Sequence, residues 1–125
     1  MTQTDHLQKT QNIYNAFKQG NLEPLYQNLA DNVLWTNHSG PESPLTGAYF
    51  GPDGVKQYLG HMEQVNLERF DIKTMMEQEG VVVVLIDVRR IVLADGHTKE
   101  GQFVHVIQFE NDKIVKMDIY EPRMI

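Results

Sequence analysis

The chain has 125 residues, of which 41% are hydrophobic, and its 17 acidic against 11 basic residues give a net charge of −6. This size and composition predict a single folded domain over residues 1–125, and the acidic balance argues against a nucleic-acid partner, which needs a basic surface. The absence of cysteine excludes disulfides, thiolate metal sites and a cysteine nucleophile. The polar N-terminal segment and the short apolar runs predict neither a signal peptide nor a membrane span, so we expect a cytoplasmic protein.

Three helices are predicted in the first half of the chain. The first carries an apolar stripe at helical spacing that includes Tyr14, and Gly20 should end it. Asn21 can cap a second helix. A glycine- and proline-rich loop is expected at 38–54, and a third helix should begin near Pro52. The apolar face of that third helix is Val55, Tyr58, Leu59 and Met62.

Strands make up the rest of the predicted structure. A short strand at 32–37 places Val33, Trp35 and Asn37 on one face. After residue 66 the pattern changes to long strands joined by short polar or glycine-bearing turns. The long strands are predicted at 67–78, 81–93, 98–110 and 113–121. Helices followed by an antiparallel meander indicate an α+β arrangement.

The lengths of the turns predict which side chains lie opposite each other. If Asn111-Asp112 is a two-residue loop, His105 lies opposite Asp118. If Asp95-Gly96 is also a two-residue loop, His105 lies opposite Ile86. The face expected to pack under the helices is then Val82, Val84, Ile86, Val88, Phe103, His105, Ile107, Phe109, Asp118 and Tyr120.

The other face of the predicted sheet is also apolar. It is expected to carry Leu85, Val104, Val106, Met117 and Ile119. So many apolar side chains are unusual on a sheet face left in water. We therefore expect a homodimer formed through this face, which a monomeric mass in dilute solution would refute.

An imidazole opposite a carboxylate on an otherwise apolar face is the strongest chemical signal in the sequence. The carboxylate of Asp118 could accept the ring N–H of His105, or it could carry the proton itself with its pKa raised by burial. The alternative is a buried polar pair that only satisfies itself. No two histidines stand at metal-ligand spacing, so no metal site is predicted. Further candidates for the walls of a pocket, with plain core packing as the alternative, are Trp35, Asn37, Tyr14, Tyr58, Met62 and Tyr120.

The order of the elements and three segments resemble the SnoaL-like branch of the nuclear transport factor 2-like superfamily, which also contains ketosteroid isomerase, scytalone dehydratase and limonene epoxide hydrolase. The segments are "IYNAFKQGNLEPLYQNLADNVLWTN", "GPDGVKQYL" and "FVHVIQFENDKIVKMDIYE". The resemblance implies a cone-shaped, curved antiparallel sheet wrapped around three N-terminal helices, with a pocket at the open end and frequent dimerisation through the sheet. In the polyketide cyclases of this branch, an acid/base pair looks similar to His105 with Asp118, and it works without cofactor or metal.

Two other branches of the superfamily match less well. Ketosteroid isomerase has a protonated aspartic acid where this chain has His105, and a carboxylate base where it has Asn37, whose amide cannot abstract a proton. In limonene epoxide hydrolase, Asn37 and Asp118 resemble two groups that hold the attacking water, and Asp87 could match the acid. Leu85, however, stands where that site has an arginine, and Trp35 stands where it has a tyrosine. The predicted register also turns Asp87 outward unless a bulge intervenes.

The sequence therefore predicts a cofactor-free enzyme acting on a small apolar carbonyl or polyketide-like molecule by isomerisation, cyclisation, or addition or loss of water. His105 and Asp118 would transfer protons, and Asn37 would orient the substrate or a water. The competing interpretations are a non-catalytic small-molecule binding domain and a dimeric scaffold with a filled cone. A pocket of roughly 300 Å³ or more that opens onto both His105 and Asp118 would favour the enzyme or the binding domain over the filled scaffold.

Overall fold

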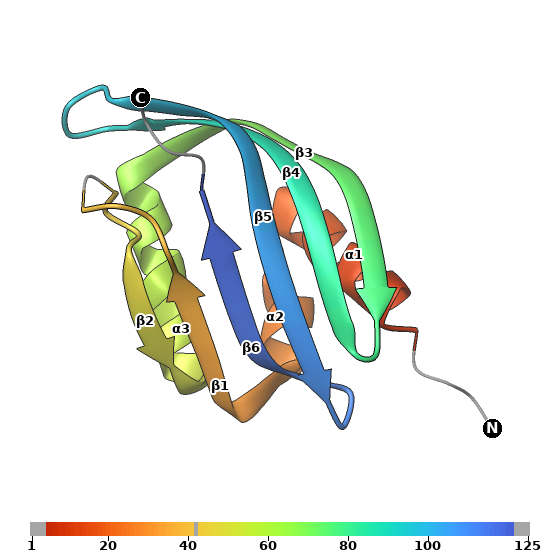
Figure 1. Cartoon of the computed structure of the whole chain (residues 1–125). Coiled ribbons are helices and arrows are strands. Elements are labelled where there is room, and N and C mark those ends of the chain that lie inside the picture. The colour runs from red at the N-terminus through yellow and green to blue at the C-terminus, as the bar shows by residue number, and fades with distance from the viewer. Residues whose placement is uncertain (1–4, 42, 122–125) are drawn as a thin grey trace.

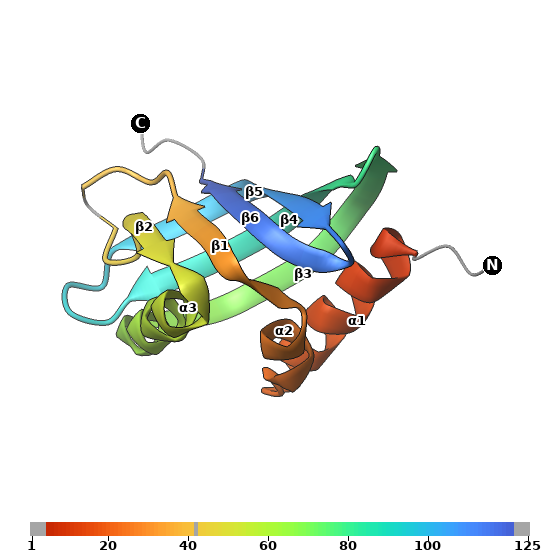
Figure 2. The same cartoon turned by 90° about the horizontal axis from the view of Figure 1, so that it is seen from below.

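The computed structural model of the chain describes residues 5–41 and 43–121, and within them a curved six-stranded sheet is covered on one side by helices (Figures 1 and 2). The helices are α1 (His6–Lys18), α2 (Glu23–Gln27) and α3 (Gly51–Gly60), with a 3₁₀ turn at His61–Gln64. Figure 2 shows α3 under one end of the sheet and the α1–α2 pair under the other. In the described part of the chain, no helix is long and apolar enough to cross a membrane.

Local signals set the limits of the helices much as the sequence predicts. The side chain of Asp5 accepts a hydrogen bond from the backbone N–H of Gln8 and so caps the start of α1. Gly20, with φ of +81°, reverses the chain after α1 in a conformation that side-chain-bearing residues rarely adopt. Pro52 lies in the first turn of α3, where its missing N–H costs nothing.

The strands pair in the order β2-β1-β6-β5-β4-β3, as the left-to-right sequence in Figure 1 shows. Their bounds are β1 (Leu29–Asn37), β2 (Gly47–Phe50), β3 (Val65–Gln78), β4 (Val81–Val92), β5 (Thr98–Glu110) and β6 (Lys113–Tyr120). Two features depart from the predicted antiparallel meander. The segment 38–54 contains the short strand β2, and β1 pairs with β6 in parallel, which makes the sheet mixed. Most of the chain separates these two strands, so the connection is long enough for parallel pairing.

The register between β5 and β6 differs from the prediction by one residue. The ladder begins as expected with Glu110 opposite Lys113, but it shifts between Phe109 and Gln108, where β6 contains an extra residue, Val115. This β-bulge places His105 opposite Ile119 instead of Asp118. Because successive side chains point to opposite faces, one residue of slip inverts every later position of the strand. The prediction that Asp118 and Tyr120 face inward is therefore wrong, and so is the outward placement of Met117 and Ile119.

The register between β4 and β5 differs by two residues, and this shift leaves the faces unchanged. The connection is longer than the predicted Asp95-Gly96 loop, so His105 lies opposite Val84 instead of Ile86. An even shift keeps each side chain on its face. The inward placement of Phe103, His105 and Ile107 is confirmed, as is the outward placement of Leu85, Val104 and Val106.

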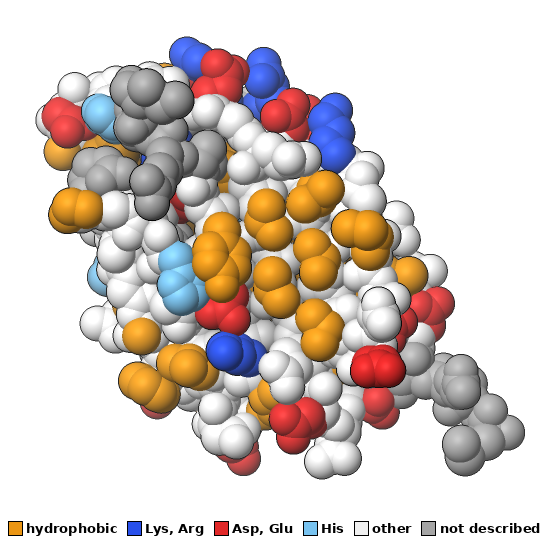
Figure 3. Space-filling view, viewed as in Figure 1, with side chains coloured by type: hydrophobic (Ala, Val, Ile, Leu, Met, Phe, Trp, Pro, Cys, Tyr) orange, Lys and Arg blue, Asp and Glu red, His pale blue; other side chains and the backbone are white. Residues whose placement is uncertain are grey.

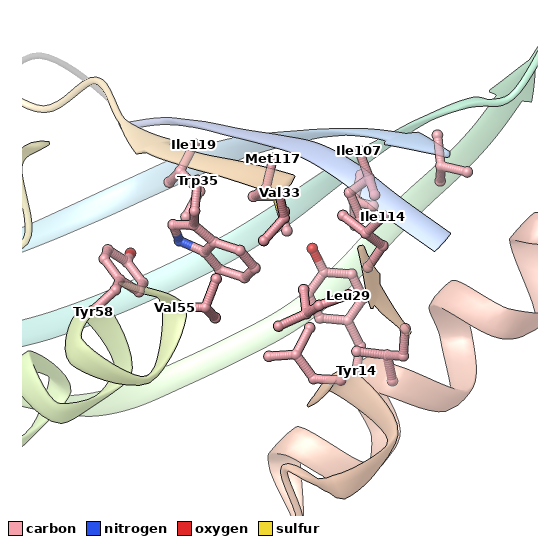
Figure 4. Packing of buried hydrophobic residues seen from close by; sticks show 14 of the residues in the cluster. Tyr14, Leu29, Val33, Trp35, Val55, Tyr58, Ile107, Ile114, Met117 and Ile119 are labelled. Carbon is pink, nitrogen blue, oxygen red and sulfur yellow. The ribbon is translucent and has the colours of Figure 1, made fainter. Parts of the chain in front are cut away.

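The core fills the space between the sheet and the helices. Figure 4 shows Trp35 reaching into it from β1, Tyr58 from α3 and Tyr14 from α1. The edge of the Trp35 ring that carries the nitrogen faces Tyr58, and the two ring centroids lie 5.5 Å apart. These three aromatic side chains, from β1, α3 and α1, therefore lie around the space between the sheet and the helices.

Candidate functional site

A cavity of about 80 Å³ lies between the inner face of the sheet and the helices. Its walls are almost entirely apolar, and it is smaller than the ~300–1,000 Å³ usual for ligand pockets. The polar groups on its walls belong to Thr10, Tyr14, Trp35, Tyr58, His105 and Glu121. His105 opens onto this cavity, whereas Asp118 does not line it.

His105 and Tyr14 form a buried polar pair on the wall of the cavity. The Tyr14 hydroxyl lies 2.5 Å from Nδ1 of His105. Burial lowers the pKa of His105 to about 4, against the opposing effect of the Glu121 charge, so the imidazole is neutral near pH 7. Burial, together with the nearby Tyr58, raises the pKa of Tyr14, so its hydroxyl stays protonated. The pair therefore holds two protons on three heteroatoms and carries no charge.

Two neutral arrangements of this pair are possible. In one, the Tyr14 hydroxyl donates to Nδ1, and the ring proton sits on Nε2. In the other, Nδ1–H donates to the Tyr14 oxygen, and Nε2 is a bare acceptor. Among the described residues, Tyr14 is the only hydrogen-bond partner of the ring. His105 can thus present either a donor or an acceptor to a molecule in the cavity.

Trp35 and Thr10 bring further polar groups to the cavity wall. Trp35 is 4% exposed and Thr10 is 0% exposed. Neither the indole Nε1 nor the Thr10 hydroxyl has a hydrogen-bond partner among the described residues. A buried donor left without a partner costs about 1–3 kcal/mol, so these groups gain if a molecule with an acceptor enters.

A buried ion network holds the end of the cavity where β4 and β6 finish. Arg90 donates to both carboxylate oxygens of Glu121, at 2.6 and 2.7 Å, and Lys99 donates to one of them at 3.0 Å. The side chains of Glu121, Arg90 and Lys99 are each 4% exposed or less. Burial alone would raise the pKa of Glu121, but hydrogen bonds from Arg90, Ser39 and Asn37 and the Arg90 charge hold it below its usual value. Glu121 is thus a fixed carboxylate and not a proton acceptor.

Asn37 links this network to the aromatic wall. Its side-chain amide donates to Glu121 and to the hydroxyl of Tyr58, each at 3.1 Å, while its oxygen accepts from the backbone and hydroxyl of Ser39. Burial raises the pKa of Tyr58 to about 12, although the hydrogen bond from Asn37 opposes the shift. The Tyr58 hydroxyl therefore keeps its proton, and because it accepts from Asn37, that proton is available to a ligand.

The structure brings together most of the residues predicted for the site. His105, Tyr14, Trp35, Tyr58 and Met62 all line the cavity. Asn37 is buried behind Tyr58 and acts on the cavity through that hydroxyl.

Asp118 and Tyr120 lie on the outer face of the sheet, which corrects their predicted place in the pocket. Asp118 accepts from Nε2 of His38 at 2.7 Å, and the His38 ring stacks on Tyr120 with centroids 4.6 Å apart. The bulge at Val115 is the physical reason, because it turns this end of β6 over. The predicted His105–Asp118 pair does not exist.

The residue set suggested by the epoxide hydrolase comparison does not assemble either. Asp87 alternates with buried neighbours in β4 and points outward, as the predicted register has it. The bulges of the β3–β4 pair interrupt β3 and leave β4 regular. Asp87 and Asp118 therefore both lie on the side of the sheet away from Asn37. Within residues 5–41 and 43–121, no group of three or more His, Asp or Glu side chains could hold a metal ion.

Sequence reasoning missed Arg90, Glu121 and Thr10. The alternation of Val82, Val84, Ile86 and Val88, continued by one step, places Arg90 on the inner face, so the signal for it was present. A buried arginine then requires a carboxylate partner. No local pattern indicates that Glu121, just after the last strand, supplies it.

Residues 10–117 match the model of the SnoaL-like domain family, and no protein of curated function matches the chain. A solved NTF2-like protein of unknown function from Burkholderia pseudomallei is 27% identical, with a TM-score of 0.82 over 96% of this chain and 92% of that chain. A protein from Mesorhizobium loti, provisionally assigned as a SnoaL-like polyketide cyclase, is 14% identical, with a TM-score of 0.74 over 94% and 99% of the two chains. TerC, co-crystallised with polyporic acid, is 23% identical, with a TM-score of 0.73 over 93% and 90%. These likenesses confirm the predicted cone-shaped fold.

Proposed function

The chain belongs to the SnoaL-like domain family, and we propose that it performs cofactor-free acid/base chemistry, of the isomerase, cyclase or hydratase type, on a small apolar carbonyl compound. The observation that carries the proposal is the buried, neutral pair of His105 and Tyr14 on the wall of an apolar cavity. A buried polar pair is costly in a core, and its position on the wall of a cavity suits a reacting group.

The neutral pair defines the chemistry that we propose. With the ring proton on Nε2, His105 would donate to a carbonyl oxygen and orient the substrate. With Nε2 bare, it would accept a proton from the adjacent carbon, and the Nε2–H so formed would donate to the enolate oxygen, while Nδ1–H donates to Tyr14. Because the pKa of His105 is about 4, the ring is a weak base. The substrate should therefore carry an acidic C–H, as between two carbonyl groups.

The comparisons add limited support to this proposal. The assignment of the Mesorhizobium loti protein as a polyketide cyclase and the polyporic acid bound to TerC are compatible with a carbonyl-bearing ligand. At these identities the likeness itself concerns the fold, which hosts unrelated functions. The support specific to this chain comes from His105, Tyr14 and the cavity.

A non-catalytic binding domain is the second candidate, and one observation favours it. Burial lowers the pKa of His105 and so weakens the ring as a base. In this alternative the same polar groups would only orient a ligand.

The test separates the two candidates with variants of the pair. We would follow the exchange of acidic C–H protons into D₂O by NMR for a panel of cyclic and open-chain 1,3-diketones. His105→Gln should abolish catalysed exchange, and Tyr14→Phe should lower it by about 10²-fold, within the range for proton-transfer groups. The matched control is His38→Gln, which alters the imidazole on the outer face and should leave the rate unchanged. Binding of a diketone without catalysed exchange by the wild type would favour the binding domain and refute the enzymatic proposal.

A further inference from the structure

A second apolar hollow lies directly beside the cavity. It is a cleft of about 300 Å³ whose walls come from the α1–α2 connection, the end of α3 with its 3₁₀ turn, and the start of β3. Figure 2 shows these elements on the helix side of the sheet, with α3 and the α1–α2 pair facing each other. The side chains that line both the cleft and the cavity are Phe17, Leu59, Met62 and Leu67. One layer of apolar side chains therefore separates the two spaces.

The side chains of this layer can change rotamer. All four of its members are half-buried, in contrast to the fully buried residues deeper in the cavity. Met62 lies in the short 3₁₀ turn and has three rotatable side-chain bonds, and methionine adapts readily to irregular space. Rotation of these side chains would join the two hollows into one site, whose size then falls within the usual range for small-molecule pockets, about 300–1,000 Å³.

The inner end of the joined site offers hydrogen-bond donors. The indole N–H of Trp35 has no partner among the described residues, and the Tyr58 hydroxyl retains a proton that Asn37 cannot accept. The acceptors at this end are already used, because Glu121 receives hydrogen bonds from Arg90, Lys99 and Asn37. The inner end thus suits an oxygen acceptor.

The charge of the ligand follows from the same surroundings. The cavity wall is apolar apart from the groups named above, and the carboxylate of Glu121 lines it. Arg90 and Lys99 are both bonded to that carboxylate. Although the network has two cations for one carboxylate, neither Arg90 nor Lys99 lines the cavity, so an anionic head would lose its hydration against apolar walls without a cation in contact. The head of the ligand is therefore neutral.

We propose that the ligand is an elongated neutral molecule whose carbonyl or similar oxygen occupies the inner cavity and whose apolar tail crosses the layer at Met62 into the cleft. This inference rests on the proposed function, because it assumes that the cavity receives a small carbonyl compound. It adds that the cavity holds only the head group, and that the cleft selects for chain length.

The test uses a series of 2-alkanones from about four to about twelve carbons. Trp35, the single tryptophan of the chain, lines the cavity, so its fluorescence and its indole N–H resonance both report binding. Once the head fills the cavity, each further methylene should improve Kd by about fourfold, the factor that corresponds to about 0.8 kcal/mol, until the cleft is full. The alkanoate of matched length should bind at least about tenfold more weakly than the ketone.

Leu22 lines the cleft without reaching the cavity, so Leu22→Asn separates the two parts of the site. We expect this variant to lose about tenfold in affinity for the longest ketone and to bind the shortest ketones as the wild type does. The matched control is Leu93→Asn, since Leu93 is exposed in the β4–β5 connection. It should change neither affinity.

Three results would contradict the inference. If affinity does not rise with chain length, or if Leu22→Asn and Leu93→Asn behave alike, the ligand does not extend into the cleft, and the proposed function is unaffected. If alkanoates bind as tightly as ketones, the neutral head is wrong. If no 2-alkanone of any length perturbs Trp35, this inference fails, and the proposed function is decided separately by the diketone exchange experiment.

Discussion

The same kinds of side chain gather on the two faces of the sheet at β5 and β6, one cluster buried and the other at the surface. On the inner face, His105 is buried and neutral, contacts the Tyr14 hydroxyl, and lies near the carboxylate of Glu121. On the outer face, His38 stacks on Tyr120 and forms a hydrogen bond with the carboxylate of Asp118. An imidazole, a phenol and a carboxylate thus occur together twice, once beside a cavity and once at the surface.

The difference shows that burial, more than residue type, decides what such a group can do. The outer imidazole is 39% exposed on its side chain, so water screens its pairing with Asp118. The inner imidazole has lost its hydration, which is why its pKa falls and why its neutral forms can exchange hydrogen-bond roles. A strand pairing predicted from sequence cannot tell which of the two faces a side chain occupies, because one residue of slip moves it from one face to the other.

The largest contrast is expected between the carboxylates of the two faces. Glu121→Gln removes the charge that compensates two buried cations, Arg90 and Lys99, and should lower the free energy of unfolding by about 3–5 kcal/mol. Asp118→Asn breaks a partly exposed pair and should cost about 0–1 kcal/mol. Urea denaturation of both variants measures the difference. Equal losses would mean that the two faces do not differ as described.

The pH dependence of stability should reveal the inner imidazole. The folded-state pKa of His105, about 4, lies below its ordinary value of 6.5, so the unfolded chain binds more protons between these values. Stability attributable to this residue is therefore complete above pH 6.5 and falls as the pH drops towards 4. Between pH 7 and pH 5, the wild type should lose about 2 kcal/mol more than His105→Gln.

The comparison requires a control on the outer face. His38→Gln removes an imidazole on that face and leaves His105 in place, so the pH-dependent loss assigned to His105 should persist in it. Denaturant titrations of the three proteins at both pH values would supply the data. A wild type and a His105→Gln variant with parallel pH curves would contradict the depressed pKa.

We also propose that a second copy of the chain covers the outer face. Figure 3 shows hydrophobic side chains gathered over this side of β4, β5 and β6. Their members include Leu85, Val104 and Val106, which are half-buried within one chain. So many apolar groups together usually mark an interface. Light scattering should give twice the mass of one chain for the wild type, and a monomeric wild type would refute the proposal.

A charged substitution tests where the dimer forms. Val106→Glu would bury a carboxylate in each copy at the interface, so the mass should fall to that of one chain. Gln57→Glu adds the same charge on the exposed side of α3, away from the sheet, and should remain dimeric. If both variants kept the dimeric mass, the interface would lie elsewhere.

The smallest effect is expected for Asp118 in ligand binding. Because this residue lies on the outer face, Asp118→Asn should change the Kd for a 2-alkanone, measured through Trp35 fluorescence, by less than about twofold. His105→Gln should weaken the same ketone by about tenfold, the loss of one hydrogen bond in a buried site. A strong effect of Asp118→Asn would place its carboxylate nearer the cavity than the structure does.

The sequence predicted the parts of the fold and site that depend on local periodicity. Tyr14 and Tyr58 lie on helical stripes, and Trp35 and Asn37 alternate within one strand, so their inward placement followed from helix and strand geometry alone. The inward placement of His105 had the same origin. The predicted faces of β4 and β5 were correct although the turn length was wrong, because the register error was two residues.

The parts that failed depend on single residues of register or on distant pairing. Nothing in the segment around Val115 marks a bulge, and this one residue separates Asp118 from the site. The parallel pairing of β1 with β6 joins segments far apart in the chain, which local patterns cannot indicate. The role of Glu121 is apparent only from its pairing with Arg90, thirty-one positions earlier, which no local pattern predicts.

The most direct test of the central claim is a titration of the histidine ring nitrogens by ¹⁵N NMR, with His105 assigned by comparison with His105→Gln. The account predicts that the His105 ring remains neutral down to a pKa of about 4. It also predicts that the shift of its Nδ1 changes in Tyr14→Phe, whereas the shifts of His38 do not. A His105 pKa at or above 6.5, or a ring insensitive to Tyr14→Phe, would contradict a buried, neutral pair beside the cavity.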